Sequence, residues 1–239
     1  MKKKTTWMAN KIKVRSPGDP LIPDGLLNTK FLEKMKRQSG RYYFEALYQG
    51  NPTAKGAGYF DEETFRYYKS APKGIKHSVI TVDAAEEDKA SSDYSVLQYW
   101  TETEASYNLI NCVRGKWKFP QLQTEVISFY NKYKPNRVVI EPKSNGKALI
   151  QNLKHMGKIP VIPVDTKFMR LSKQERTNQI IGQVESGNVL FPEDAAWLWD
   201  FKSEVLDFDN GEHDDQVDAM VHAIYYLVYK KKLRRIRSL

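Results

Sequence analysis

The apolar residues of the chain fall into short runs separated by polar segments, a pattern typical of a sheet with connecting helices. Strand-like runs cover five segments, His77–Asp83, Tyr94–Trp100, Tyr107–Val113, Arg137–Ile140 and Pro160–Val164. Apolar residues recur at helical spacing over about 120–132, 145–156, 172–186 and 195–206, and a last helix begins near Asp214, after the short apolar segment Val189–Pro192. A three-stranded meander followed by strand–helix units predicts an α/β fold with a mixed sheet and helices on both faces.

Residues 1–60 lack such regular patterning, because prolines interrupt them at Pro17, Pro20, Pro23 and Pro52. Short helices are predicted over about 28–38 and 40–47. We therefore expect residues 1–60 to form a linker or the remnant of a preceding domain, and residues 61–239 to form one folded domain.

Three acids, Asp214, Asp215 and Asp218, open the last predicted helix. Residues three or four apart share one face of a helix, so Asp218 repels Asp214 or Asp215, and nearby apolar residues add a desolvation cost. An acidic N-cap explains one aspartate but not three. Taken alone, the segment leaves two alternatives open, an acidic cap and a bound cation.

Two further acids end predicted strands. Asp83 follows an apolar run and by itself is equally compatible with a turn, whereas Glu141 follows Val138-Val139-Ile140 and must reach either solvent or a cation. If the two strands are parallel and adjacent, both acids stand at the same edge of the sheet. Together the acids indicate a metal cluster in which two divalent ions hydrolyse a phosphodiester.

Composition narrows the choice of metal. The single cysteine, Cys112, excludes an internal disulfide and a cysteine-rich zinc site, and its apolar surroundings favour a buried bystander over a nucleophile. Carboxylate ligands favour magnesium or manganese. We expect a cytoplasmic protein without a membrane span, since no apolar run is long enough to cross a membrane and no signal-peptide pattern is present.

The net charge of +9 is concentrated at the ends of the chain. Residues 1–40 hold ten Lys/Arg and three Asp/Glu, and residues 230–239 hold six Lys/Arg and no acid. Such ends suit nucleic acid, although a solubilising terminus is the alternative. Further basic residues near the acids are expected to contact the DNA backbone with weak sequence preference, namely Lys143, Lys147, Lys167, Arg170, Lys173 and Arg176. Ser144-Asn145-Gly146 either lets the backbone approach a phosphate or caps a helix.

Three motifs carry a resemblance to a known family: Val82-Asp83-Ala84-Ala85, Ile140-Glu141-Pro142 and the segment from His213 to Ala219. They resemble the C-terminal nuclease domain of the large terminase subunit of tailed bacteriophages, which has an RNase H-like fold. Upstream, the segment 43–52 and Gly58-Tyr59-Phe60 resemble the junction that follows the ATPase motor in that family. The segment 215–219 also resembles the end of Holliday-junction resolvases of the same fold.

The resemblance implies an endonuclease that cuts concatemeric viral DNA with two Mg²⁺ or Mn²⁺ ions. It implies metal ligands at Asp83, Glu141 and the Asp214/Asp215 pair, with Asp215 favoured and Asp218 as a fourth acid. The catalytic residues would be Asp83, Glu141, Asp215 and Asp218, while His213 either orients a ligand or simply leads the helix. The implied partners are double-stranded DNA, an ATPase motor, the portal and the small terminase subunit, in the cytoplasm of the bacterial host.

One family feature is missing from the sequence. No Gly-x-x-x-x-Gly-Lys-Ser/Thr loop is present, because Gly146-Lys147 has no matching upstream glycine and is followed by Ala148. The resemblance therefore implies a nuclease half, either excised or separately encoded. Two alternatives stay open: a junction resolvase, which would be a dimer that prefers branched DNA, and a non-catalytic DNA- or portal-binding module, in which Asp83→Ala would leave every activity unchanged.

Overall fold

The computed structural model describes residues 30–35, 59–85 and 94–236 of the 239-residue chain. The chain divides into two compact units, Met1–Ala57 and Gly58–Leu239. In the first unit a helix covers residues 30–35, inside the predicted 28–38, and Leu32 packs there against Phe31 and Met35. The predicted helix over 40–47 and the junction segment 43–52 lie outside the described residues.

The second unit is built on a mixed sheet. In the described part of the chain, seven strands pair in the order β1-β7-β4-β3-β2-β5-β6. Strands β2, β3 and β4 form the antiparallel meander, whereas β5 and β6 continue the sheet parallel to β2, and β7 and β1 continue it from β4, also in parallel. Their bounds are β1 Arg66–Tyr68, β2 His77–Asp83, β3 Ser95–Glu102, β4 Tyr107–Gly115, β5 Arg137–Ile140, β6 Val161–Pro163 and β7 Val189–Pro192.

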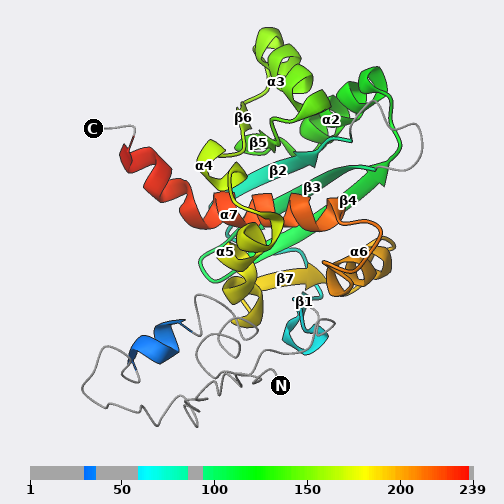
Figure 1. Cartoon of the computed structure of the whole chain (residues 1–239). Helices are drawn as coiled ribbons and strands as arrows, with labels where there is room; N and C mark the ends of the chain where they lie inside the picture. The colour runs from blue at the N-terminus through cyan, green and yellow to red at the C-terminus, as the bar shows by residue number, and fades with distance from the viewer. Residues whose placement is uncertain (1–29, 36–58, 86–93, 237–239) are drawn as a thin grey trace, which may run out of the picture. The chain divides into compact units, whose positions relative to one another are not determined.

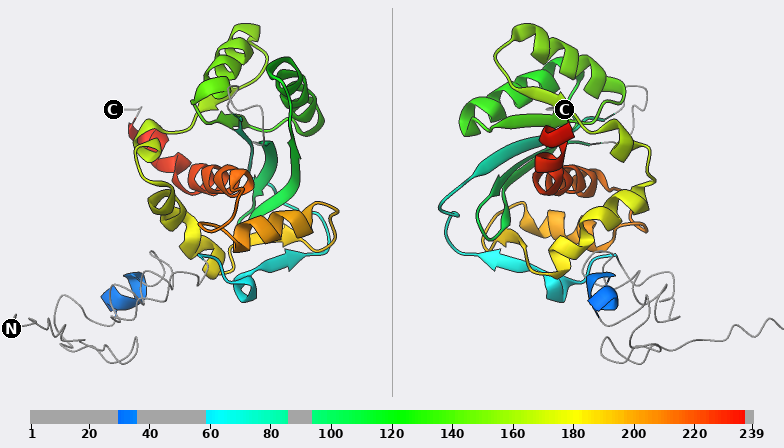
Figure 2. Two further views of the ribbon diagram at one scale, coloured as in Figure 1. Left: turned by 45° about the vertical axis from the view of Figure 1, so that its right-hand side comes forward. Right: turned by 90° about the vertical axis from the view of Figure 1, so that its left-hand side faces the viewer.

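Helices cover both faces of this sheet, as the sequence predicts. Helix α7 packs on β2, β3 and β4, while α2 packs on β3, and α3 contacts β6 and α2. Figure 1 shows α7, in orange to red, crossing one face, and Figure 2 shows α2 and α3, in green, beyond the opposite face. The helices are α2 Phe119–Tyr133, α3 Ser144–Met156, α4 Thr166–Met169, α5 Lys173–Glu185, α6 Leu198–Leu206 and α7 Asp215–Ile236.

Alternation along the central strands creates two hydrophobic cores. In β2, Val79 belongs to the core under α7, whereas Ile80 and Val82, which point to the other face, belong to the core under α2 and α3. Strand β5 alternates in the same way, with Val139 on the α7 side and Ile140 on the other. Because both faces are buried, these strands appear in the sequence as continuous apolar runs, which is why their bounds were predictable.

Several elements differ from the sequence prediction. The short strand β1 was not predicted, because two of its three residues are exposed and no apolar alternation marks it. Helix α6 begins at Leu198 rather than near 195, since a turn precedes it in which the Leu198 N–H donates to the Ala195 carbonyl. Phe60 is buried and packs edge-on against Phe208, so the predicted domain boundary after residue 60 lies within the second unit.

A search of the described helices for a segment long and apolar enough to cross a lipid bilayer finds none.

The buried thiol of Cys112 in β4 supplies a test of this packing. Cys112 lies beneath α7, where its Sγ donates to the Oε1 of Gln216 at 3.3 Å, and burial raises the pKa of the thiol to about 12. Since the thiolate is the reactive form, we expect the native protein not to react with a disulfide reagent at mildly alkaline pH, and the urea-unfolded protein to react fully. Rapid reaction of the native chain in a stopped-flow assay would contradict the packing of α7 on β4.

Candidate active site

Pairing of β2 with β5 brings two of the predicted acids together. The strands are parallel and adjacent, with Val82 opposite Ile140, and the Glu141 N–H donates to the Val82 carbonyl at 3.3 Å. Asp83 is the last residue of β2, and Glu141 directly follows β5. The condition under which both acids stand at one edge of the sheet is therefore met.

The beginning of α7 brings further acids to this edge. Asp214 precedes the helix, and its carbonyl accepts from the Asp218 N–H at 2.9 Å, so the first turn runs from Asp214 to Asp218. Helix α7 packs on β2, which ends at Asp83. Burial, and then the negative charges of Asp218, Glu141 and Asp215, raise the pKa of Asp83 well above its usual value. Four carboxylates thus interact across the end of the sheet.

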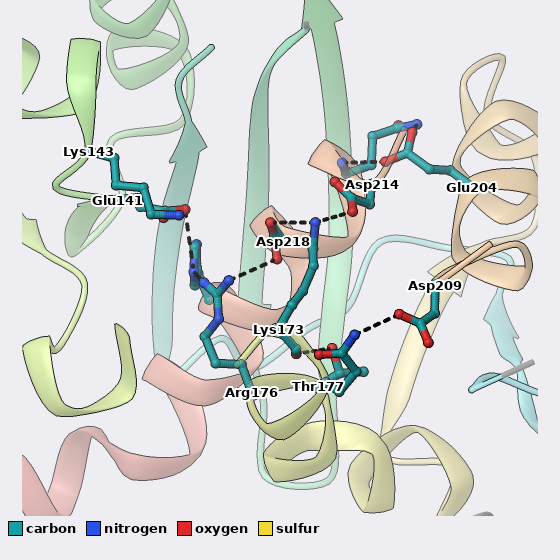
Figure 3. A network of polar contacts seen from close by, with 12 residues as sticks. Glu141, Lys143, Lys173, Arg176, Thr177, Glu204, Asp209, Asp214 and Asp218 are labelled. Carbon is teal, nitrogen blue, oxygen red and sulfur yellow. Dashed lines mark hydrogen bonds and ion pairs between the residues drawn. The ribbon is translucent and has the colours of Figure 1, made fainter. Parts of the chain in front are cut away.

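Two cations of α5 turn toward these acids. Lys173, the first residue of α5, forms ion pairs with Asp214 and, at 3.0 Å, with Asp218 (Figure 3). Arg176 lies one turn further on, with its Nη2 at 3.8 Å from the Oδ1 of Asp218, and it is only 5% exposed. The sequence predicts that both side chains contact the DNA backbone, but here they are engaged with the protein's own acids.

The other predicted DNA-binding residues lie at the surface. Lys143 is 59% exposed, and its Nζ lies 2.5 Å from the Oε1 of Glu141. The side chains of three further residues are exposed: Lys147 on α3, Lys167 on α4 and Arg170 just after α4. Their exposure is compatible with contact to a phosphate backbone, which stays a prediction.

A buried histidine, His222 of α7, lies between Arg176 and Glu141. Its Nε2 is 3.1 Å from the Nη1 of Arg176 and 3.9 Å from the Oε2 of Glu141. An arginine can only donate, so this nitrogen accepts and the imidazole is neutral, in keeping with burial, which lowers the pKa of His222 to about 4. For Glu141, burial acts to raise the pKa, but nearby positive charge outweighs it and lowers the pKa. Because His222 is neutral at physiological pH, we assign that charge to Lys143 and Arg176.

His213, which the sequence offers as a possible orienting residue, has a different neighbour. Its ring packs edge-on against that of Tyr94, with the centroids 5.4 Å apart.

In this arrangement, no group of three or more Asp, Glu, His or Cys side chains in the described residues is placed to hold a metal ion. Two of the predicted acids are instead paired with cations, Asp214 with Lys173 and Asp218 with Lys173 and Arg176. The donor set itself suits a hard divalent cation, since it consists of carboxylates whose charges repel one another at Asp83. The residues therefore fit a divalent ion by their chemistry, as hard oxygen donors.

The first turn of α7 is held from below by a buried acid that sequence analysis missed. Both Oε atoms of Glu204, on α6, accept from Gln216 at 2.6 Å, one from its backbone N–H and one from its side-chain amide. The Gln216 carbonyl accepts from the Nε2 of Gln98 in β3 at 2.8 Å, and Arg114 lies 3.4 Å from Glu204. The sequence signal for this role was the position of Glu204 among the apolar residues Phe201 and Val205.

A second tie joins the end of β2 to the beginning of α3. The Nδ2 of Asn145 donates to the Ala85 carbonyl at 2.8 Å, and no side chain caps α3 at Lys143, so the interpretation of Ser144-Asn145-Gly146 as a helix cap is wrong. A Cβ on Gly146 would overlap the Glu141 carbonyl oxygen. Only glycine allows α3 to begin this close to Glu141.

Comparisons with known proteins place this geometry in context. The model of the family described as the terminase RNase H-like domain matches residues 80–227. In a search of curated protein sequences, none matches the chain.

Solved structures show the fold. The large terminase of a thermophilic bacteriophage has a TM-score of 0.63 at 11% identity, over 83% of this chain and 51% of that one. The same terminase in complex with ADP has a TM-score of 0.60 at 12% identity, over 84% of this chain and 52% of that one. The large terminase nuclease of a second thermophilic phage, G20c, with bound magnesium has a TM-score of 0.54 at 17% identity, over 71% and 97%. The chain spans about half the length of the first of these terminases, and the predicted RNase H-like α/β fold is confirmed.

Removal of the Glu204 carboxylate should destabilise the protein. In Glu204→Ala the buried N–H and side-chain amide of Gln216 lose their acceptor, so we expect the free energy of unfolding to fall by about 2–4 kcal/mol, measured by urea unfolding followed by circular dichroism. Asp200→Ala is the matched control, because Asp200 pairs with the same Arg114 but its side chain is 50% exposed. That change should cost less than about 1 kcal/mol, and equal losses in both variants would contradict the role of Glu204.

Gly146→Ala should also destabilise the protein, although glycine-to-alanine changes inside helices ordinarily stabilise by up to about 1 kcal/mol. The added Cβ must push α3 away from the Glu141 carbonyl, and we expect a loss of about 2–3 kcal/mol in the same unfolding assay. A stabilised variant would show that α3 begins farther from Glu141.

Proposed function

The chain belongs to the family of terminase RNase H-like domains, and from this premise we propose that it is a divalent-metal-dependent endonuclease that cuts concatemeric viral DNA. The observation that carries the proposal is the meeting of acids from three elements. Asp83 ends β2, Glu141 follows the parallel neighbour β5, and Asp215 and Asp218 come from the first turn of α7. A protein that only bound DNA would gain nothing by gathering negative charge where phosphate must dock.

Each acid has a proposed task. Asp83, Glu141 and Asp215 would hold two Mg²⁺ or Mn²⁺ ions, with Asp218 as a fourth acid and Asp214 beside Asp215 as the alternative ligand. Divalent ions, when bound, stabilise charge that develops on phosphate oxygens and lower the pKa of water. The magnesium bound in the G20c nuclease supports a divalent ion here. The scaffold's contribution is to fix the carboxylates at the end of a buried sheet.

The exposed cations around the acids would bind the DNA backbone. Lys143 and Lys147 flank Glu141 on the α3 side, and Lys167 and Arg170 lie on and after α4, before Lys173. Contacts of this kind position a duplex without reading its sequence, and the affinity should fall steeply with salt concentration.

The proposed partners follow from the proteins that this chain resembles. The terminase solved in complex with ADP is about twice as long as its matching region, so we expect an ATPase motor to act with this domain, in the same polypeptide or in another. Double-stranded DNA, the portal and the small terminase subunit complete the expected set of partners, and the cytoplasm of the bacterial host is the expected compartment.

Cleavage of supercoiled plasmid tests the function. We expect nicking and linearisation with Mn²⁺ or Mg²⁺, none with chelator, and a loss of at least about 100-fold in Asp83→Asn and Asp215→Asn, because a ligand and its charge are removed. Asp194→Asn removes one exposed carboxylate before α6 and should cleave like the wild type. Cleavage that survives in both active-site variants would place the reaction elsewhere.

Asp83→Asn should separate stability from activity. A carboxyl group whose pKa is raised in the folded state destabilises the fold at every pH above its pKa in the unfolded chain, and asparagine removes that cost. We therefore expect the metal-free variant to unfold at a higher temperature than the wild type at neutral pH, while cleavage is lost. A lower melting temperature would show that Asp83 stabilises the fold.

Two other outcomes of the cleavage assay identify the alternatives. A strong preference for four-way junctions over linear duplex, together with a stable dimer, would favour a resolvase. DNA binding without cleavage under any metal condition would favour the non-catalytic assembly module.

A further inference from the structure

Lys173 occupies an unusual position for a lysine on the first turn of a helix. Its ammonium lies between the carboxylates of Asp214 and Asp218, in contact with both, and the side chain is only 25% exposed (Figure 3). Burial opposes its charge, but Asp218 and Asp214 raise the pKa of the ammonium above its usual value. The side chain therefore stays protonated and places a positive charge inside the acid cluster.

This one charge compensates the cluster only in part. The ammonium also acts on Asp83, but its stabilising effect on that carboxylate is smaller than the opposing effects of burial and of three neighbouring acids. The charge of Lys173 therefore does not offset the repulsion at Asp83. A divalent cation would compensate the cluster better, but it cannot contact the same carboxylate oxygens while the ammonium is there.

The surroundings decide which cation is able to leave. Ser172 and Glu175 form a capping box that fixes the backbone at the beginning of α5, so the movement falls to the flexible side chain of Lys173. Arg176, by contrast, is nearly fully buried and held by His222 and Asp218. Lys173 is the cation that is both in contact with two acids and able to reach solvent by rotating its own stem.

We propose that Lys173 is an exchangeable internal counter-ion: its ammonium holds Asp214 and Asp218 together in the metal-free protein and moves out to solvent when a divalent cation binds the acid cluster. This inference rests on the proposed function, since it requires that the cluster bind a divalent cation. It goes further by describing the site before metal is bound, when the Lys173 ammonium pairs with the acids. It also explains why the metal-free acids do not form a ready ligand set.

Chemical labelling of the wild-type 239-residue chain tests the exchange directly. Acetylation of lysines is followed residue by residue with mass spectrometry, with and without saturating Mn²⁺. We expect the labelling rate of Lys173 to rise by about tenfold with Mn²⁺, because its reactive amine is held in the acid cluster until the metal displaces it. Lys158, which is exposed between α3 and β6, should be labelled at the same rate in both conditions. An unchanged or lower rate at Lys173 with Mn²⁺ bound would overturn the proposal.

Calorimetry with substituted proteins provides the second measurement. Lys173→Met should bind Mn²⁺ about tenfold more tightly than the wild type, since no ammonium has to be displaced, and should melt at a lower temperature without metal. Lys158→Met should match the wild type in both respects. Lys147→Met is the charge control, because it removes an exposed positive charge of α3 rather than the one lying between Asp214 and Asp218.

The outcomes separate this inference from the proposed function. Equal gains in affinity for Lys147→Met and Lys173→Met would mean that net charge alone is responsible and would overturn the exchange. Normal Mn²⁺ binding with no change in either Lys173 measurement would overturn the exchange and leave the nuclease proposal standing. A wild-type protein that binds no Mn²⁺ would overturn both.

Discussion

Repulsion among carboxylates at one end of a buried sheet is the constraint around which this structure is arranged. The acids come from β2, from the residue after β5 and from the first turn of α7, and burial of Asp83 makes their mutual charge costly. In a loosely held site the acids would separate into solvent. Here the elements that carry them are packed into both cores of the domain, so the repulsion is retained and has to be balanced by positive charge.

The polar contacts beneath the site show how the acids are kept in place. Glu204 and Gln98 grip Gln216 within the first turn of α7, while Asn145 ties the end of β2 to the beginning of α3. These contacts act on residues one or two positions from an acid rather than on the acid itself. The polar contacts beneath the site therefore leave the carboxylates to other partners, and two of the cations that pair with them, Lys173 and Arg176, come from a separate helix, α5.

How much of this was predictable depends on whether a feature is local in the sequence. Strands β2 and β5 were predicted with their observed bounds because both of their faces are buried, so each is a continuous apolar run. The positions of Asp83, Glu141 and the α7 acids relative to those elements followed directly. The sequence analysis could only assume that β2 and β5 are neighbours. Nothing in the two apolar runs specifies which strand each of them pairs with.

Features that depend on contacts between distant elements were beyond the sequence. Lys173 and Arg176 look like surface cations in the first turns of a helix, and only the packing of α5 beside α7 shows that they face acids. Likewise, the roles of Glu204 and His222 arise across the α6–α7 and β5–α7 contacts. Short exposed elements such as β1 were missed because burial leaves no pattern on them.

Helix α7 carries acids in its first turn and core residues along the turns that follow. Ala219, Met220, Ala223 and Ile224 are fully buried directly after Asp218. A substitution that alters the packing of this helix therefore also shifts the carboxylates at its beginning. The opposite core, under α2 and α3, constrains the other acids in the same way, because it contains Val82 and Ile140, the residues directly before Asp83 and Glu141.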